Sequence, residues 1–216
     1  MPFQQAAFDQ MPIVGILRGI SPEALEAIIP AYQEAGLTTL EITMNTEGFT
    51  GMMTAAVAEY GSRLNIGAGT VCSEEDLDRA LAAGAQFIVT PILNETVVKK
   101  CVDQGIPVFP GALTPSEIYQ AWTWGATMVK VFPASAFGPS YIREVLAPLN
   151  ELRLLPTGGV SLENMADYYR AGAGGFGLGS LLFDKKLIEA KQWPALQHKM
   201  QAVADHCRQI RPLKDR

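Results

Sequence analysis

One lysine lies where a chain rarely places a charge, in the apolar run of residues 128–133. Because side chains alternate along a strand, Lys130 would share one face with Met128 and Phe132, and the flanking valines would take the other. Burial disfavours the ammonium form and lowers the pKa of such a lysine. A neutral amine is the nucleophile that forms an imine with a carbonyl carbon. The alternative is a structural lysine whose ammonium reaches solvent.

Two further charged residues occupy apolar runs of the same kind. Glu41 lies within residues 40–44, and a buried carboxylate there would pair with Lys130 for proton transfer. The alternative for this pair is a purely structural ion pair. Arg18 ends the run at residues 15–19, and its guanidinium suits a carboxylate or a phosphate. The alternative for Arg18 is a surface salt bridge.

Glycine-rich runs at residues 157–160 and 177–180 follow two later apolar segments. Glycine loops at neighbouring strand ends, followed by a short helix, commonly bind phosphate through backbone N–H groups. The alternative is a pair of tight turns. Thr70, at the end of residues 67–71, has the parity to face the same interior and to hydrogen-bond a substrate.

The histidines argue against a metal centre among these runs. The chain has two, His198 and His206, and both fall in the expected last helix. A metal-dependent site, or a histidine general base, would need histidine near the strand ends. We therefore expect no metal, and Lys130 and Glu41 remain as the candidate catalytic residues.

The elements that position these residues follow a weak internal repeat of 20 to 25 residues. Helix-like stretches end in a residue that tolerates the left-handed conformation. These residues are Gly36, Gly61, Gly84, Gly105, Gly125, Asn150 and Gly172. Capping residues open four helices, at Ser21, Ser73, Thr114 and Ser161. The expected strands are residues 13–19, 38–44, 64–71, 87–91, 107–112, 128–132, 154–160 and 175–178.

Strands that alternate with helices predict a parallel sheet, and eight such units predict closure into a (β/α)₈ TIM barrel. An open, doubly wound sheet is the alternative. We see no linker or shift in composition, so we expect a single domain over residues 1–216. In such a barrel the carboxyl ends of the strands gather the site residues in one place.

Composition narrows the class of protein. The net charge of −5 argues against a dedicated nucleic-acid binder. Three cysteines, without metal or redox spacing, indicate a reducing cytoplasmic compartment. No signal peptide is visible, and uncharged runs are shorter than the ~20 residues of a membrane span, so we expect no membrane association.

Six motifs in order carry a family resemblance. They lie at residues 15–19, 41–43, 67–71, 130–134, 137–139 and 157–160. Over nearly the whole chain the sequence resembles the 2-keto-3-deoxy-6-phosphogluconate (KDPG) / 4-hydroxy-2-oxoglutarate (KHG) aldolase family. The resemblance implies a class I aldolase that splits KDPG into pyruvate and glyceraldehyde 3-phosphate. It also implies a homotrimer without cofactor or metal.

The resemblance assigns a role to each candidate residue. It makes Lys130 the Schiff-base lysine and Glu41 the general acid and base. The residues that would line the substrate site are Arg18, Thr70, Pro91, Phe132 and Thr157. Those that would hold the phosphate of the phosphorylated keto acid are Gly158, Gly159, Gly179 and Ser180.

Two positions, Asn45 and Thr157, indicate different substrate preferences. Phosphogluconate aldolases usually carry Arg where this chain has Asn45. The relatives specific for the galactonate epimer (KDPGal) carry Asn at this position, as this chain does. Thr157 resembles the gluconate type, and we expect KDPG to be preferred. Cleavage of KDPGal or of the unphosphorylated KHG stays an alternative. A sugar-phosphate epimerase or isomerase, or a non-catalytic phosphate-binding barrel, would not need Lys130.

Overall fold

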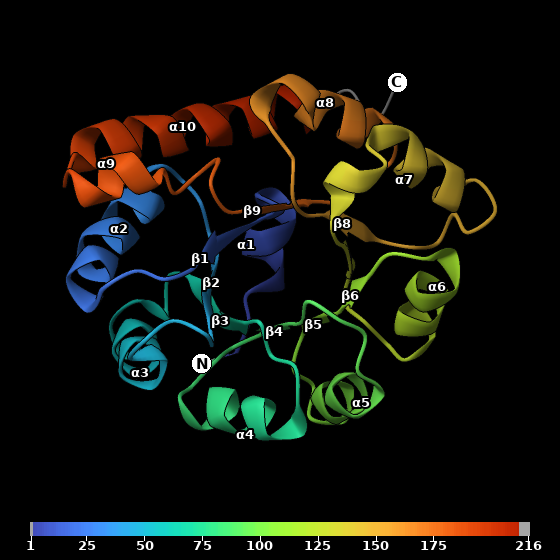
Figure 1. The fold of residues 1–216 in the computed structure, drawn as a ribbon, viewed down its shortest axis with the longest axis horizontal. Helices are drawn as coiled ribbons and strands as arrows, with labels where there is room; N and C mark the ends of the chain where they lie inside the picture. Colours follow the sequence, from blue (N-terminus) through green and yellow to red (C-terminus); the bar gives the residue numbers. More distant parts are fainter. Residues whose placement is uncertain (1, 212–216) are drawn as a thin grey trace.

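A computed structural model of the chain describes residues 2–211. Helices surround a central set of short strands (Figure 1). The strands are β1 Ile13–Leu17, β2 Thr39–Thr43, β3 Asn65–Gly69, β4 Ile88–Val89, β5 Val108–Phe109, β6 Gly111–Ala112, β7 Val129–Val131, β8 Leu154–Pro156 and β9 Phe176–Leu178. The helices are α1 Gln5–Gln10, α2 Pro22–Glu34, α3 Phe49–Tyr60, α4 Glu74–Ala82, α5 Glu95–Asp103, α6 Pro115–Thr123, α7 Pro139–Leu146, α8 Leu162–Arg170, α9 Lys185–Glu189 and α10 Trp193–Ile210, with a short 3₁₀ turn η1 Ala134–Ala136. Within residues 2–211 no helix is long and apolar enough to cross a membrane.

The expected helix boundaries hold at most junctions. Ser21 and Ser73 accept hydrogen bonds from the first turns of α2 and α4, and Thr114 and Ser161 form capping boxes. Five of the predicted junction glycines adopt positive φ; these are Gly36, Gly84, Gly105, Gly125 and Gly172. Gly61 does not, since its φ is −62° and the chain continues into a right-handed turn after α3. Asn150 is also outside the positive-φ set.

All the strand pairs are parallel. They form a six-stranded sheet in the order β5-β4-β3-β2-β1-β9 and a three-stranded sheet in the order β6-β7-β8. The prediction of one strand over residues 107–112 was wrong: Pro110 separates β5 from β6. Proline has no N–H to donate to a ladder, although the Pro110 carbonyl still accepts from Lys130 N at 2.9 Å. A single bridge between Thr157 and Gly177 joins β8 to β9.

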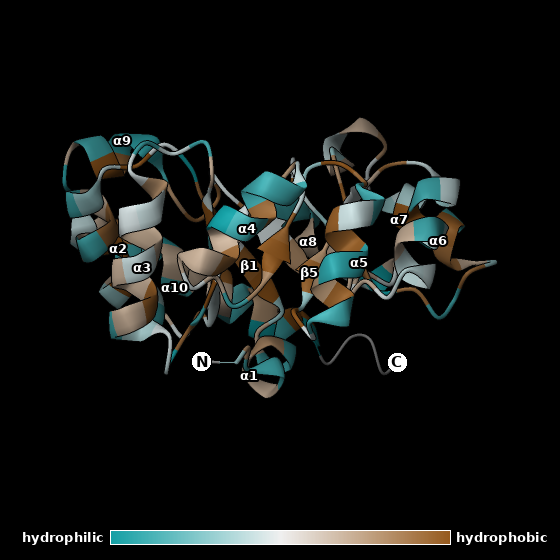
Figure 2. Cartoon of the chain, turned by 90° about the horizontal axis from the view of Figure 1, so that it is seen from below, coloured by the Kyte–Doolittle hydropathy of each residue, from teal (hydrophilic) through white to brown (hydrophobic). Residues whose placement is uncertain are grey.

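The interior below the site is filled by an aromatic layer. Phe8 of α1 packs edge-on against Phe109 at 5.5 Å between ring centroids, and Phe87 packs against Phe109 at 5.7 Å. All three side chains are fully buried. In Figure 2, α1 lies beneath the apolar strands, on the side opposite α9. The layer therefore closes the strand interior at its amino end and leaves the polar residues at the other end.

Candidate active site

A cavity of about 1000 Å³ opens at the carboxyl ends of β1, β7, β8 and β9. Eight of the predicted site residues line it: Arg18, Lys130, Phe132, Thr157, Gly158, Gly159, Gly179 and Ser180. Three others do not belong to its lining, namely Glu41, Thr70 and Pro91. Eight residues that are far apart in the sequence thus come together at one cavity, whereas Glu41 is buried and outside its lining.

Lys130 occupies the middle of β7 and is 5% exposed. Its Nζ lies 5.3 Å from the centroid of the Phe132 ring. Burial lowers the pKa of Lys130; the Glu41 carboxylate raises it and the Arg18 guanidinium lowers it further. Lowering the pKa increases the neutral fraction of the amine, which is the form that attacks a carbonyl.

Glu41, in the middle of β2, is 1% exposed. Burial raises its pKa, while the charges of Lys130 and Arg18 lower it. Its Oε2 has no hydrogen-bond partner among the described residues, and no ion pair with Lys130 forms within 4.0 Å. The structural ion pair considered from the sequence is thus not formed, and the carboxylate is free to accept or release a proton.

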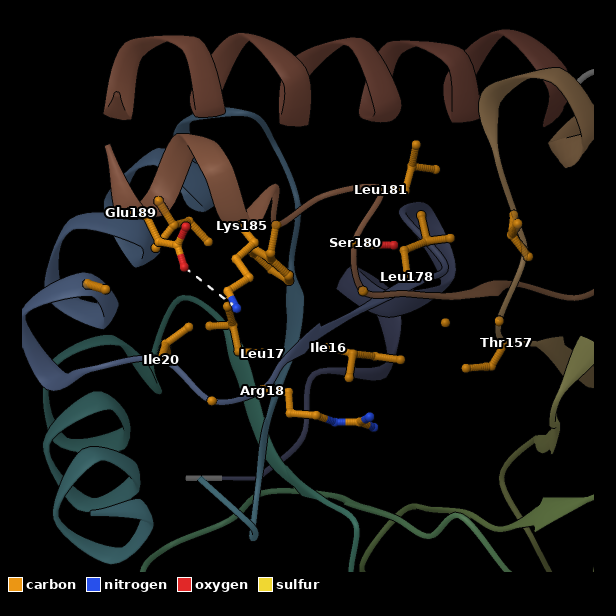
Figure 3. A pocket seen from close by; sticks show the side chains of 18 of the residues that line it. Ile16, Leu17, Arg18, Ile20, Thr157, Leu178, Ser180, Leu181, Lys185 and Glu189 are labelled. Atoms are coloured by element: carbon orange, nitrogen blue, oxygen red, sulfur yellow. Dashed lines mark ion pairs between the residues drawn. The ribbon is translucent and has the colours of Figure 1, made fainter. Parts of the chain in front are cut away.

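Arg18 follows β1 and is exposed at the cavity wall. In the described part of the chain it makes no ion pair, which removes the surface salt bridge as an explanation of this residue. Its side chain extends away from the Lys185–Glu189 ion pair and toward the side on which Thr157 lies (Figure 3). An unpaired guanidinium here is suited to bind an anionic group of a substrate.

Thr70 follows β3 with a φ of +63°, an unusual conformation for a residue other than glycine. Beside it, Gly69 faces Glu41: a Cβ on Gly69 would lie 2.3 Å from Glu41 Oε1. Cys72 Sγ lies 3.6 Å from the Thr70 carbonyl oxygen, and a thiolate there would raise the pKa of Lys130. The strained residue Thr70 thus directly follows Gly69, the residue of β3 that lies against the Glu41 carboxylate.

Pro91 lies against β6, the strand next to that of Lys130. Gly111 pairs with Lys130 in the β6–β7 register, and a Cβ on Gly111 would lie 2.5 Å from the Pro91 carbonyl carbon. Pro91 is therefore one strand away from the strand of Lys130, although it is not part of the cavity lining.

The two glycine runs provide backbone donors beside the cavity. Gly158 and Gly159 both have positive φ, at 90° and 74°. Neither Gly159 nor Ser180 donates its backbone N–H to another group within residues 2–211. The Gly179 carbonyl accepts from the backbone N–H groups of residues 182 and 183 in a turn, and the expected short helix follows this turn as α9. Such free N–H groups are suited to an anion.

Thr157 is 4% exposed and its Oγ1 donates to the Leu155 carbonyl at 3.2 Å. A Cβ on Gly177 would lie 2.1 Å from the same Oγ1. The Thr157 hydroxyl, which was expected to contact the substrate, is thus directed at β8 and at Gly177 of β9.

Sequence reasoning missed two features of the site. The cavity continues between α2 and α9, where Lys185 and Glu189 form an ion pair at 3.6 Å. Their i, i+4 spacing is a signal that could have been read from the sequence. A hydroxyl pair, Thr43 and Thr46, lies at the end of β2. Thr43 has the parity of Glu41, but its partner depends on how the following turn folds.

Neither histidine reaches the cavity, since His198 and His206 both belong to α10. Among residues 2–211 no group of three or more His, Cys, Asp or Glu side chains could hold a metal ion.

Comparison with known proteins decides the family. The sequence profile of the KDPG and KHG aldolase family matches residues 5–199. The chain belongs to this family. A 2-dehydro-3-deoxy-6-phosphogalactonate aldolase of Escherichia coli K12 is 39% identical over 175 residues, 81% of this chain and 85% of the relative. A 2-dehydro-3-deoxy-phosphogluconate aldolase of Haemophilus influenzae Rd is 32% identical over 197 residues, 91% and 92% of the two chains.

A solved structure described as native KDPGal covers 94% of this chain and 98% of its own, with a TM-score of 0.82 and 37% identity. This KDPG/KHG family member is therefore an aldolase, an enzyme that makes and breaks carbon–carbon bonds. Its α/β fold with parallel sheets agrees with that structure.

Proposed function

We propose that this aldolase works through a Schiff base on Lys130 and cleaves 2-keto-3-deoxy-6-phospho sugar acids to pyruvate and glyceraldehyde 3-phosphate. The observation that carries the proposal is Lys130 itself, a buried lysine with a lowered pKa at the wall of a large cavity, close to a buried carboxylate. An epimerase or isomerase on a similar phosphate-binding fold has no use for this lysine.

The chemistry follows from these two groups. The neutral amine of Lys130 attacks the C2 carbonyl, and Glu41 supplies the proton with which the carbinolamine loses water to give the protonated imine. The ionised Glu41 then accepts the C4 hydroxyl proton, and the C3–C4 bond breaks. The electron pair flows into the imine and leaves the pyruvate enamine on Lys130 and a free aldehyde. Protonation of the enamine and hydrolysis release pyruvate.

Arg18 is our candidate for the carboxylate of the substrate. The carboxylate carbon is bonded to C2, so this anion must lie beside Lys130 when the imine forms. Arg18 is near enough to influence the pKa of both Lys130 and Glu41, which supports this role. The phosphate on C6, four carbons beyond C2, would then bind the free N–H groups of the glycine runs. KHG carries its second anion as a carboxylate one carbon closer to C2 than the phosphorylated carbon, and it stays an alternative substrate.

Both C4 epimers are proposed as substrates. The expected preference for KDPG depended on the Thr157 hydroxyl, and the hydrogen bond of this group to Leu155 leaves it less available. Asn45 is exposed beyond β2, and the relative named a phosphogalactonate aldolase is 39% identical. These observations support cleavage of KDPGal beside KDPG. The preference for KDPG stays a prediction.

We further propose that the two sheets close into one eight-stranded barrel and that the whole chain is a single domain. The Thr157–Gly177 bridge and the Pro110–Lys130 hydrogen bond support closure at the two breaks. A homotrimer is proposed from the family resemblance, and Phe137, 58% exposed and stacked on Tyr141, offers apolar surface to a partner. Light scattering that reports a monomer would contradict the trimer alone.

Reductive trapping tests the proposed function. Pyruvate and borohydride should add one pyruvate-derived group, and peptide mapping should locate it on Lys130. Lys99 and Lys100, exposed or surface-paired on α5, provide internal controls in the same digest. Absence of label, or label on either control lysine, would contradict the Schiff-base mechanism.

A further inference from the structure

A buried hydroxyl pair links the strand of Glu41 to the turn that follows Arg18. Thr43 is fully buried and Thr46 is 3% exposed. Their Oγ1 atoms lie 3.1 Å apart, and Thr46 Oγ1 also accepts a hydrogen bond from Gly19 N at 3.0 Å.

The Thr46 hydroxyl is held in place by the backbone around it. Thr46 N–H donates to the Thr43 carbonyl at 2.9 Å, and the Thr46 carbonyl accepts from Phe49 N at 3.1 Å. With its backbone fixed at both groups and its side chain buried, Thr46 presents Oγ1 as a rigid acceptor at the end of β2. Thr43 faces the same side of β2 as Glu41, two residues earlier.

The turn after β1 needs such an anchor. Gly19 is exposed and has a φ of +62°, and a Cβ built on it would point into open space, with no atom within 4 Å. Arg18 makes no ion pair within the described chain that could fix its side chain. The bond from Gly19 N to Thr46 is therefore a tertiary contact that determines where the backbone of Arg18 stands.

We propose that Thr46 is a positioning residue that acts through Arg18. Its hydroxyl holds Gly19, so that the guanidinium reaches the carboxylate of a keto acid beside Lys130. The inference builds on the proposed function, because it takes Arg18 as the group that binds this anion. It predicts that losing the Thr46 hydroxyl weakens substrate binding while the chemistry of Lys130 and Glu41 continues.

The first test compares Thr46→Val with Thr46→Ser, because valine keeps the shape and serine keeps the hydroxyl. Thr46→Val should raise KM for the phosphorylated keto acid by about 10-fold, the usual worth of one hydrogen bond, with kcat within about 3-fold of wild type. Thr46→Ser should restore KM. Thr127→Val is the matched control, since Thr127 Oγ1 also accepts a backbone N–H, from Val108 at 3.1 Å, ahead of β7.

A double-mutant cycle tells positioning from a general structural effect. In an Arg18→Ala background Thr46→Val should change KM by less than about 2-fold, because the group it positions has been removed. Additive effects, or an unchanged KM in Thr46→Val, would overturn the proposal. If Thr46→Val does not fold, Thr46→Ala in the same cycle carries the same expectation.

Trapping separates this inference from the proposed function. At saturating pyruvate, borohydride should label Lys130 fully in Thr46→Val. A wild-type enzyme that takes no label refutes the Schiff-base function itself. Full labelling in both proteins with equal KM for the phosphorylated keto acid refutes only the role of Thr46.

Discussion

Gly69 and Glu41 lie against each other across the β2–β3 pair, so that a Cβ on Gly69 would come within 2.3 Å of the carboxylate. Gly69→Ala should therefore displace the carboxylate and lower kcat by about 100-fold, the usual cost of a misplacement near 1 Å. The fold should survive, because the end of a side chain gives way rather than the backbone. Steady-state kinetics with circular dichroism checks both statements.

Gly51→Ala is the matched control for this substitution. Gly51 lies inside α3, and a Cβ there meets nothing within 4 Å. Alanine should leave turnover unchanged and raise stability by up to about 1 kcal/mol, since glycine is a poor helix former. Equal activity of the two alanine variants would show that the contact with Glu41 does not matter.

Glu41→Gln should slow turnover by roughly 10²–10⁴-fold, the usual contribution of a positioned acid or base. The swap is nearly isosteric, so thermal unfolding should change little. Glu47→Gln, at an exposed glutamate beyond the end of β2, is the control and should be as active as wild type. Near-normal turnover in Glu41→Gln would assign the proton transfers to another group.

The pH profile of kcat/KM should rise through the pKa of Lys130, because the proposed mechanism requires its neutral amine as the nucleophile. The Arg18 charge lowers this pKa and the Glu41 charge raises it. Arg18→Gln should therefore move the acidic limb to higher pH, and Glu41→Gln should move it to lower pH. Lys100→Gln, in a surface ion-pair cluster on α5, should leave the limb in place. Shifts in the same direction for the first two variants would contradict the charge assignment.

The two C4 epimers should be cleaved with kcat/KM values within about 100-fold of each other, or about 2.7 kcal/mol. A site rejects one epimer strongly only when a polar group hydrogen-bonds the C4 hydroxyl of the other. The Thr157 hydroxyl is less available for this role, because it donates a hydrogen bond to the Leu155 carbonyl. Thr157→Val should shift the ratio only modestly toward KDPGal, because the hydroxyl can still accept a hydrogen bond while it donates to Leu155. Assays of both purified epimers decide the matter, and a wild-type ratio above this bound, or any preference for KDPGal, would contradict the predicted preference for KDPG.

Metal chelation should leave turnover unchanged. The expectation comes from the placement of both histidines on α10, away from the cavity. Activity before and after prolonged dialysis against a chelator checks it, and loss of activity that a divalent cation restores would refute it.

The sequence predicted approximately where the strands lie and the parity of the key side chains, because both depend on local rules. Strands β1, β3 and β8 end earlier than predicted, at Leu17, Gly69 and Pro156. Met128 packs in the interior cluster, whereas Val129 and Val131 join the cluster shared with the helices, as alternation required. The break at Pro110 escaped prediction, although proline inside a strand is a warning. The expected role of Thr157 depended on a hydroxyl direction that a one-dimensional pattern cannot contain.

Contacts between residues that are distant in the sequence could not be predicted either, because a sequence pattern contains only local information. The Gly19–Thr46 bond joins residues 27 positions apart, and threonine hydroxyls find partners of many kinds. The extension of the cavity toward α9 depends on how the last two helices pack. Helix α1 was not predicted either, because six residues carry too little periodicity.

The aromatic layer of Phe8, Phe87 and Phe109 bears on the order in which products depart. With the strand interior filled on that side, molecules reach Lys130 and leave it through the mouth at the carboxyl ends of the strands. On the proposed mechanism, the pyruvyl half would stay bound to Lys130 in the interior, and the aldehyde half with its phosphate would lie nearer the mouth. Release is then ordered, and pyruvate should inhibit competitively against the sugar acid, whereas the aldehyde should inhibit noncompetitively.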